Sequence, residues 1–458
     1  MKKILCLFDY GPADVTMTGY ATVSRNIVAQ VKKRFEANIR LDIIAINYFG
    51  EPYKEYEDSV KVVSAAESQR KLGIATIVKD GGEFGRMSFL KELEDGDYDG
   101  IFILQDLGTV AGMVPLIRMI RDRKYANQRK TFKSIIYFPV DGPIQERVKN
   151  KEFDKGKLSK WPKEYQKYFK EDIVQLDELE FFDMAVTYTK YGQKEIAKLK
   201  PPSRLIVANL YHGINLQEFY PMEVLARNNF RRNYFKQHAQ NYIVGVINRN
   251  QPRKDIPTAI FGYMHARENW DKSIPAPFLY LHMNPVDPKG WDLYKLLNSL
   301  GLIEGKDYMF PRDADKNGQV DVEILNGIYN SIDVYLSTSR GEGWGLTATE
   351  AMACKVPCIL PDHTSLGEIG ADHRALLLKE FLPVCDTVDN TERDMCHFEE
   401  VGEAIQDMAR RKYNSGEFDK NYTENAYEFV AENSWEDIGF IWGVWFGKIY
   451  GIENLSNV

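Results

Sequence analysis

Two glutamates, Glu342 and Glu350, flank a glycine-rich turn and have seven residues between them. The turn follows an apolar segment typical of a buried strand, and it precedes a helix expected from about Leu346 to Lys355. Glycines let a backbone turn sharply, and the open N–H groups at a helix start bind phosphate well. Carboxylates accept hydrogen bonds from sugar hydroxyls. The segment therefore predicts a site for a ligand that combines a diphosphate with a sugar, as a nucleotide sugar does.

The segment resembles the E-x7-E signature of the retaining glycosyltransferases of the GT-B fold. This large family (glycosyltransferase family four-like) includes sucrose synthases and mannosyltransferases. The resemblance implies that Glu342 contacts the donor sugar and that Glu350 contacts the nucleotide ribose. Further donor-binding residues implied by the match are Gly343, Trp344, Gly345 and Leu346. The alternative is an ordinary strand, turn and helix with two surface acids.

A basic turn follows the apolar segment Tyr242–Ile247. The family places an arginine and, a few residues later, a lysine at this turn to clamp the donor diphosphate, and Arg249 and Lys254 match that pattern. Such cations stabilise the negative charge that grows as the bond between sugar and phosphate breaks. Arg253 is an equally basic neighbour, so the sequence leaves open which two residues act. A solvated basic turn is the alternative.

Two positions in the first half also follow expected strands. Gly19, after Thr18, opens a helix as in the family's first glycine loop, whose backbone approaches the donor phosphate and the reacting sugar. A plain turn between strand and helix is the alternative. Asp141 stands where many relatives have a histidine, so it either orients a sugar or acceptor hydroxyl or serves as a turn residue before Gly142. The predicted catalytic residues are Glu342, Asp141, Arg249 and Lys254.

Short apolar segments alternate with helical stretches along the chain. This alternation indicates parallel sheets covered on both faces by helices. The expected strands are Ile4–Phe8, Ile43–Ile46, Ile101–Leu104, Ile135–Val140 and Ala185–Thr189, then Tyr242–Ile247, Phe278–Met283, Val334–Ser337 and Val356–Leu360. The pattern restarts after about residue 220, so two doubly wound α/β domains are expected.

The resemblance implies GT-B architecture, with two Rossmann-like domains that face a deep cleft. The expected parts are an acceptor domain (residues 1–210), a nucleotide-sugar donor domain (residues 211–430) and a C-terminal helix (residues 431–458) that crosses back onto the first domain. The junction from Leu205 to Pro221 is similar to the family's linker. Trp435, Trp442 and Trp445 recur at helical spacing, which predicts one apolar stripe for core packing.

The composition, with 44% hydrophobic and 27% charged residues, is ordinary for a globular protein in water. No stretch reaches the ~18 apolar residues of a membrane-spanning helix, and the start of the chain is expected to be a buried strand, not a signal peptide. The five cysteines are few and lack metal spacing, which favours a reducing compartment. We therefore expect a cytoplasmic protein, with attachment at a membrane surface as an open alternative.

The seven histidines show no pair spacing for zinc, and the family generally works without a divalent ion. No metal and no cofactor are therefore expected, and a UDP-sugar donor is expected in preference to a GDP-sugar. Basic residues concentrate in Arg118–Lys133 and Lys149–Asp172. Such runs are usually solvated helix faces; the alternative is a site for an anionic acceptor, such as a lipid headgroup, a polymer or DNA.

These observations predict a retaining, hexosyltransferase-like glycosyltransferase that moves a sugar from a nucleotide sugar to an acceptor hydroxyl. Three alternatives stay open: an enzyme that glycosylates hydroxymethylated bases in DNA, a GT-B nucleotide-sugar epimerase, and a non-catalytic nucleotide-sugar binding module. An epimerase would convert the nucleotide sugar without an acceptor. A binding module would keep its biological effect without Glu342 or Lys254.

Overall fold

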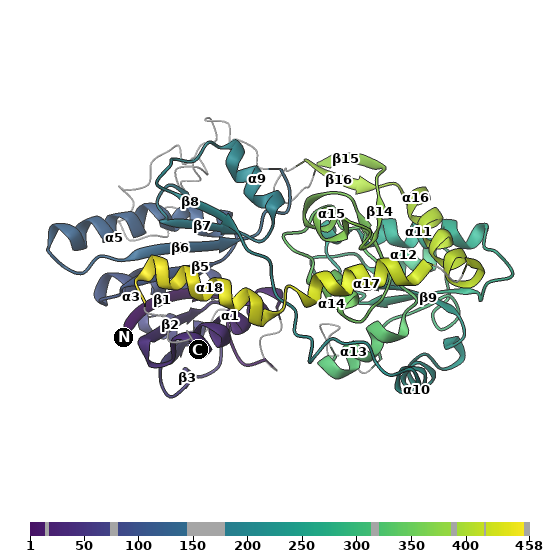
Figure 1. The fold of residues 1–458 in the computed structure, drawn as a ribbon, viewed down its shortest axis with the longest axis horizontal. Helices are drawn as coiled ribbons and strands as arrows, with labels where there is room; N and C mark the ends of the chain where they lie inside the picture. Colours follow the sequence, from purple (N-terminus) through teal and green to yellow (C-terminus); the bar gives the residue numbers. More distant parts are fainter. Residues whose placement is uncertain are drawn as a thin grey trace. The chain divides into compact units, whose positions relative to one another are not determined.

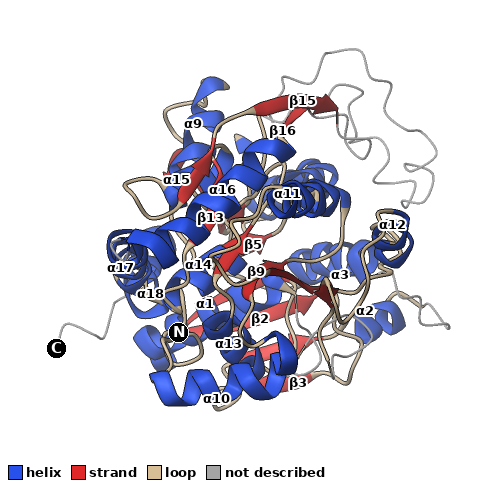
Figure 2. Ribbon diagram, turned by 90° about the vertical axis from the view of Figure 1, so that its right-hand side faces the viewer, coloured by secondary structure: helices blue, strands red, loops and turns tan. Residues whose placement is uncertain are grey.

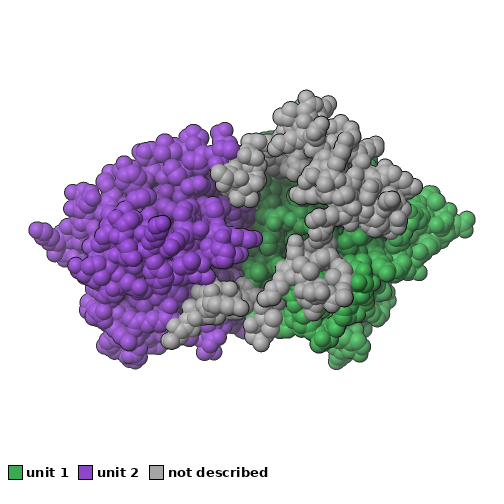
Figure 3. All heavy atoms as spheres, turned by 180° about the vertical axis from the view of Figure 1, so that it is seen from behind, with its two compact units in different colours: residues 1–140, 144–212, 435–458 green, residues 141–143, 213–434 purple. Residues whose placement is uncertain are grey.

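The computed structural model describes residues 1–13, 18–73, 81–143, 179–312, 320–385, 392–415 and 418–452. The chain forms two compact units, each with its own sheet (Figures 1 and 3). Unit 1 contains residues 1–140, 144–212 and 435–458, and unit 2 contains residues 141–143 and 213–434. Parallel strands covered by helices, as predicted, make up both units.

The described residues of unit 1 form an eight-stranded sheet in the order β3-β4-β2-β1-β5-β6-β7-β8. Its strands are β1 (Lys2–Phe8), β2 (Ile39–Ala45), β3 (Tyr53–Glu55), β4 (Val60–Val63), β5 (Gly100–Leu104), β6 (Lys133–Phe138), β7 (Met184–Thr187) and β8 (Ile206–Asn209). β3 pairs antiparallel with β4, and the other pairs in these residues are parallel. The last five residues of β1 are all buried, as expected for a strand covered on both faces.

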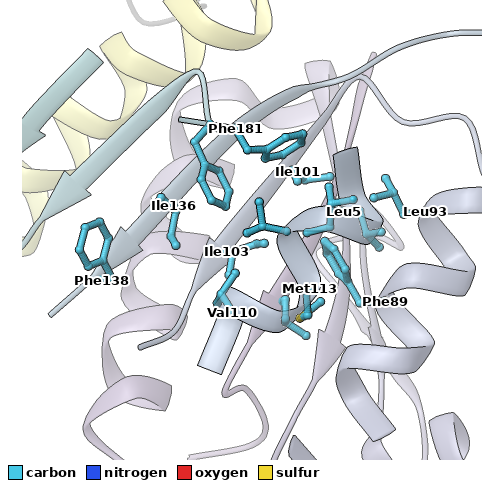
Figure 4. Packing of buried hydrophobic residues seen from close by; sticks show 14 of the residues in the cluster. Leu5, Phe89, Leu93, Ile101, Ile103, Val110, Met113, Ile136, Phe138 and Phe181 are labelled. Atoms are coloured by element: carbon cyan, nitrogen blue, oxygen red, sulfur yellow. The ribbon is translucent and has the colours of Figure 1, made fainter. Parts of the chain in front are cut away.

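Helices α1 (Gly19–Phe35), α2 (Ala65–Lys71), α3 (Gly81–Asp95), α4 (Leu107–Val110), α5 (Val114–Ala126), α9 (Lys190–Lys198) and α18 (Trp435–Tyr450) accompany this sheet. On one face, Ile101 and Ile103 of β5 belong to the same buried cluster as Phe89 and Leu93 of α3 (Figure 4). This cluster also includes Phe181, which lies just before β7. Apolar side chains from distant parts of the sequence therefore share one core in unit 1.

Helix α18 belongs to unit 1 although it follows all of unit 2 in the sequence (Figure 1). Trp442 is fully buried, and its ring centroid lies 5.1 Å from that of Phe102 on β5 and 5.0 Å from that of Tyr137 on β6. A Cβ atom at Gly443 would lie 2.8 Å from Cδ of Arg34, so this glycine permits close packing of α18 on α1. The predicted return of the C-terminal helix to the first domain is confirmed.

The described residues of unit 2 form a six-stranded parallel sheet in the order β11-β10-β9-β12-β13-β14. Its strands are β9 (Tyr242–Ile247), β10 (Pro277–His282), β11 (Tyr308–Met309), β12 (Val334–Leu336), β13 (Cys358–Pro361) and β14 (Leu376–Leu378). β15 (Phe381–Cys385) and β16 (Glu392–Cys396) form a separate antiparallel hairpin (Figure 2). The helices are α10 (Val224–Phe235), α11 (Ile256–Glu268), α12 (Leu293–Ser299), α13 (Val322–Ser331), α14 (Leu346–Ala353), α15 (Thr364–Gly370), α16 (Phe398–Arg410) and α17 (Phe418–Ala431).

Strands β9 and β12 are parallel neighbours, with Val334 opposite Val244. Their carboxyl ends therefore lie side by side at one edge of the sheet. The basic turn follows β9, and the turn with the paired glutamates follows β12. Ligands of open α/β sheets bind at this edge, and the topology alone brings the two predicted parts of the donor site together.

Candidate functional site

The turn that carries Glu342 joins β12 to α14, which begins at Leu346. Gly345 precedes the helix with φ +110°, a backbone angle that residues with side chains rarely adopt. A Cβ atom at this position would also lie 2.6 Å from Cδ2 of Leu366. Gly345 has no side chain, so the first N–H groups of α14 receive no side-chain cap from this residue.

Glu342 is buried, and its carboxylate contacts two cations. Its Oε1 accepts hydrogen bonds from Lys254 Nζ and, over 2.8 Å, from Ser339 Oγ. Its Oε2 accepts a 2.9 Å hydrogen bond from Arg253 Nη1. Burial raises the pKa of Glu342, but Arg253 and Lys254 outweigh burial and lower this pKa to about 2. Burial lowers the pKa of Lys254, although Glu342 opposes that shift. Glu342 is therefore ionised at neutral pH and accepts hydrogen bonds.

The two cations end a short helical turn (Pro252–Lys254) that follows β9. The next residue, Asp255, has φ +48°, and its buried carboxylate accepts a 2.9 Å hydrogen bond from Arg340 Nη2. The N–H of Arg340 also donates to the carbonyl of Arg253 over 2.8 Å. These two bonds hold the basic turn against the glutamate turn, so the contacts with Glu342 follow from the backbone arrangement.

Arg249, the arginine matched to the family pattern, lies apart from this cluster. Its side chain is exposed, and its Nε donates to Oδ2 of Asp287 over 2.9 Å. The structure thus brings Arg253, and not Arg249, to Glu342. The part that either arginine plays in donor binding stays a prediction.

Glu350 lies on α14 in a half-buried position, and its Oε2 accepts a 2.7 Å hydrogen bond from the hydroxyl of Tyr329. Burial raises the pKa of Glu350 to about 7; Tyr329 opposes this shift and Glu218 adds to it. Glu350 therefore changes charge near neutral pH, unlike Glu342. Tyr329 belongs to α13, and no motif in the sequence pointed to it.

The residues between the two glutamates lie inside unit 2. Gly343 and Trp344 are buried, and the carbonyl of Trp344 accepts a 2.6 Å hydrogen bond from Ser365 Oγ. This bond fixes the backbone of the turn against the start of α15. The expectation that Trp344 shapes a sugar pocket stays a prediction.

Asp141 lies in the short segment that belongs to unit 2. Its Oδ2 is 3.4 Å from Nε of Arg253, and its Oδ1 is 3.4 Å from Nη2 of Arg393. Arg393 Nη1 also donates to the carbonyl of Asp141 over 2.6 Å. Sequence reasoning missed Arg393, which lies on β16 far from every motif. The role of Asp141 in catalysis stays a prediction.

Gly19 lies in unit 1 as the first residue of α1. Thr18 caps this helix: its Oγ1 accepts a 3.1 Å hydrogen bond from the N–H of Ala21 and donates to Asp9. Asn47 donates to the same carboxylate over 3.1 Å. The side chain of Thr18 therefore satisfies one N–H group of this helix start, and the predicted approach of Gly19 to the donor stays a prediction.

The basic segment Arg118–Lys133 is largely neutralised within unit 1. Its ion pairs join Arg123 to Glu94, Arg129 to Asp97, Lys130 to Asp99 and Lys133 to Asp183. A pocket of about 720 Å³ is lined by two of these ion pairs, Lys130 with Asp99 and Lys133 with Asp183, and also by Lys2 and Lys448. The ion pairs favour the interpretation as an ordinary charged surface. The second basic segment, Lys149–Asp172, lies outside the described residues.

Within the residues that the structure describes, no group of three or more His, Cys, Asp or Glu side chains is placed to hold a metal ion. Independence of metals stays a prediction. Across the same part of the chain, every helix is too short or too polar to cross a membrane.

The sequence model of the family described as "Glycosyl transferases group 1" matches residues 317–387. This stretch lies in unit 2 and contains both glutamates of the signature. It includes the turn at Gly345 and helix α14, which form one side of the candidate site. None of the curated protein sequences compared with the chain matches it.

Solved structures resemble the chain over almost its full length. Sucrose-phosphate synthase from Thermosynechococcus elongatus has a TM-score of 0.67 and 16% identity, covering 99% of this chain and 100% of that one. HepE from Anabaena, in complex with UDP-glucose, has a TM-score of 0.59 and 12% identity (98% and 100% covered). An E. coli structure titled "Trehalose-6-phosphate", bound with UDP-2-fluoro glucose, has a TM-score of 0.62 and 12% identity (99% and 100% covered). These similarities confirm the predicted GT-B fold.

Proposed function

We propose that the protein is a glycosyltransferase that takes a sugar from a nucleotide-sugar donor and transfers it to a hydroxyl of an acceptor. The observation that carries the proposal is the cluster at the start of α14, where the ionised Glu342 meets Arg253 and Lys254. The family match over residues 317–387 and the UDP-glucose bound by HepE support it.

The site offers one group for each part of such a donor. Glu342 is a hydrogen-bond acceptor for sugar hydroxyls because its carboxylate is ionised. Lys254 and Arg253, with the amides of Gly345 and Leu346, would hold the diphosphate, whose charge grows as the sugar leaves. Glu350 would accept hydrogen bonds from the ribose. Hydrogen bonds from the ribose hydroxyls favour the ionised form of this carboxyl, so they would lower its pKa.

We further propose that transfer retains the configuration of the sugar, that the donor is a UDP-sugar, and that no metal or cofactor takes part. In the family, the departing phosphate is thought to help deprotonate the acceptor on the same face of the sugar. Retention is tested by NMR of the product: an α-linked donor should give an α-linked product. A β-linked product would contradict this part of the proposal.

The decisive experiment measures thermal unfolding with UDP-glucose, UDP and GDP-mannose. A ligand that binds only the native state increases the free energy of unfolding, by about 2.7 kcal/mol at a hundredfold excess over Kd. The apparent melting temperature therefore rises. UDP-glucose should stabilise the wild type more than UDP does, and Glu342→Gln should remove that difference. Glu268→Gln, at an exposed end of α11, is the matched control.

The rival functions predict other outcomes of the same assays. Conversion of the donor without any acceptor, seen by NMR, would indicate an epimerase. Stabilisation by nucleotide sugars without turnover on any acceptor would indicate a binding module. If no nucleotide sugar stabilises the protein at millimolar concentration, the proposed function is wrong.

A further inference from the structure

Two arginines bracket the carboxylate of Asp141, one at each oxygen. Arg253 Nε lies 3.4 Å from Oδ2, and Arg393 Nη2 lies 3.4 Å from Oδ1. Paired guanidinium groups on one small anion are the arrangement with which proteins bind phosphate. The side chain of Asp141 is 35% exposed, whereas that of Arg393 is 5% exposed. The anion can therefore move out of this position more easily than the cation.

Arg393 is held in place independently of the Asp141 carboxylate. It lies on β16, opposite Val384 of β15, and its Nη1 donates to the main-chain carbonyl of Asp141 over 2.6 Å. A Cβ atom at Gly341 would lie 2.0 Å from that carbonyl oxygen and 2.8 Å from Nη1. Gly341 thus permits a close approach that keeps the guanidinium beside the glutamate turn when the carboxylate leaves.

The cluster contains charged side chains of both signs. Arg253, Lys254 and Arg393 supply three positive charges, and Asp141 and Glu342 supply two negative ones. Glu342 is buried and has its own hydroxyl donor in Ser339, so it is fixed. A phosphate dianion between the two arginines would carry one more negative charge than the carboxylate of Asp141 that it displaces, so each guanidinium would attract it more strongly.

We propose that Arg253 and Arg393 form a binding site for a phosphate group, which the carboxylate of Asp141 fills in the ligand-free protein. Two sources share this chemistry: the diphosphate of a nucleotide donor and a phosphate group on the acceptor. The inference deepens the proposed function, because it adds a cation from the β15–β16 hairpin to the site and gives Asp141 the role of an internal competitor.

The test is calorimetric titration of the full chain with inorganic phosphate, UDP and glucose 6-phosphate. Asp141→Asn removes the competing charge, so at least one probe should bind up to about fivefold more tightly, the size expected for loss of a partly exposed ion pair. Arg393→Gln removes a charge-assisted hydrogen bond, so the same probe should bind about tenfold more weakly. Arg267→Gln, which breaks a pair with Asp307 elsewhere in unit 2, is the matched control.

The pattern of effects identifies the source. An effect on UDP assigns the site to the donor diphosphate, and an effect on glucose 6-phosphate without one on UDP assigns it to the acceptor. Unchanged affinity for all three probes in Arg393→Gln would overturn the inference. If Arg393→Gln fails to fold, Asp141→Asn decides alone, because a failure to tighten any probe would also overturn it.

The proposed function is judged separately, by transfer from UDP-glucose in the wild type. Wild-type transfer combined with phosphate affinities that neither variant changes would refute the phosphate site and leave the glycosyltransferase proposal standing. If the phosphate affinities change as expected but the wild type transfers sugar to no acceptor, the phosphate site is supported and the glycosyltransferase proposal is refuted.

Discussion

Units 1 and 2 each contain a turn in which a glycine lies at the start of a helix, but the two helix starts are satisfied differently. In unit 1, Thr18 caps α1 and also binds the carboxylate of Asp9. In unit 2, Gly345 leaves α14 without a side-chain cap, and the turn before it carries Glu342, which pairs with Arg253 and Lys254. A phosphate would be repelled by the acid at the first turn and attracted by the cations near the second.

The comparison teaches that a glycine at a helix start is weak evidence for an anion site. The sequence pattern of both turns matched the family, yet only the second lacks a side-chain cap and carries a glutamate that pairs with two half-buried cations. What distinguishes the two is the cap and the charge around it. Each of the following experiments changes one of these properties.

The largest effect is expected from Glu342→Gln, which removes the ionised acceptor from the second turn. With a nucleotide-sugar donor, kcat/KM should fall by about 10²–10³, as when one hydrogen bond of the transition state is lost. Initial rates with UDP-glucose measure this change, with Glu268→Gln as the control. A loss below about threefold would remove Glu342 from the catalytic set.

Gly345→Ala tests whether the second turn depends on its backbone. A side chain would have to adopt φ +110° and would meet Leu366, so we expect a loss of about 2–3 kcal/mol in the free energy of unfolding. Denaturant unfolding measures it. Gly301→Ala is the matched control, because Gly301 has φ +73° with nothing within 4 Å of the added Cβ atom, and it should cost about 1 kcal/mol. Equal losses would show that the contact with Leu366 is unimportant.

Thr18→Ala tests the first turn. Loss of this helix cap should reduce the free energy of unfolding by about 1 kcal/mol. Ser64→Ala, which removes the corresponding cap of α2 through the N–H of Glu67, should have a similar effect. If Ser64→Ala lowers the free energy of unfolding and Thr18→Ala does not, the cap by Thr18 does not stabilise the start of α1.

The smallest effect is expected from Glu350→Gln and depends on pH. The pKa of Glu350 is about 7 in the folded chain, above its ordinary value of 4.5, so the native state binds more protons in this range. Stability should therefore decrease as pH rises from about 4.5 to above 7. The variant lacks this loss, so its melting temperature should exceed that of the wild type by about 2 °C at pH 8 and match it at pH 5.

Glu342 provides the opposite signature. Its pKa of about 2 lies below the ordinary value, so its contribution to stability is complete above about pH 4.5 and is lost as pH falls through 2. For Glu350, a wild type that melts at a higher temperature than Glu350→Gln at pH 8 would contradict the raised pKa of this carboxyl.

The central strands could be predicted from the sequence because they are covered on both faces and are therefore continuously apolar. All nine expected strands overlap strands of the structure, from β1 to β13. The hairpin β15–β16 was missed because most of its residues are half-buried or exposed and because β16 begins with three charged residues. Short edge strands such as β11, with two residues, carry too little pattern to be found.

The meeting of Glu342 with Lys254 was predictable in outline, since both follow neighbouring parallel strands. The sequence could not decide between Arg249 and Arg253. That choice depends on the short helical turn Pro252–Lys254 and on the left-handed backbone of Asp255 at its end. The contact of Arg393 with Asp141 spans 252 residues of sequence and depends on the register of a hairpin. No local pattern encodes such a contact.

The position of helix α18 has a consequence for synthesis. A ribosome completes every residue of unit 2 before Trp442 is made, yet this side chain covers Phe102 and Tyr137 in the first unit. The nascent first unit must therefore wait, with an aromatic surface on β5 and β6 exposed, while the second unit can already fold. That surface is where a chaperone would be expected to bind during translation.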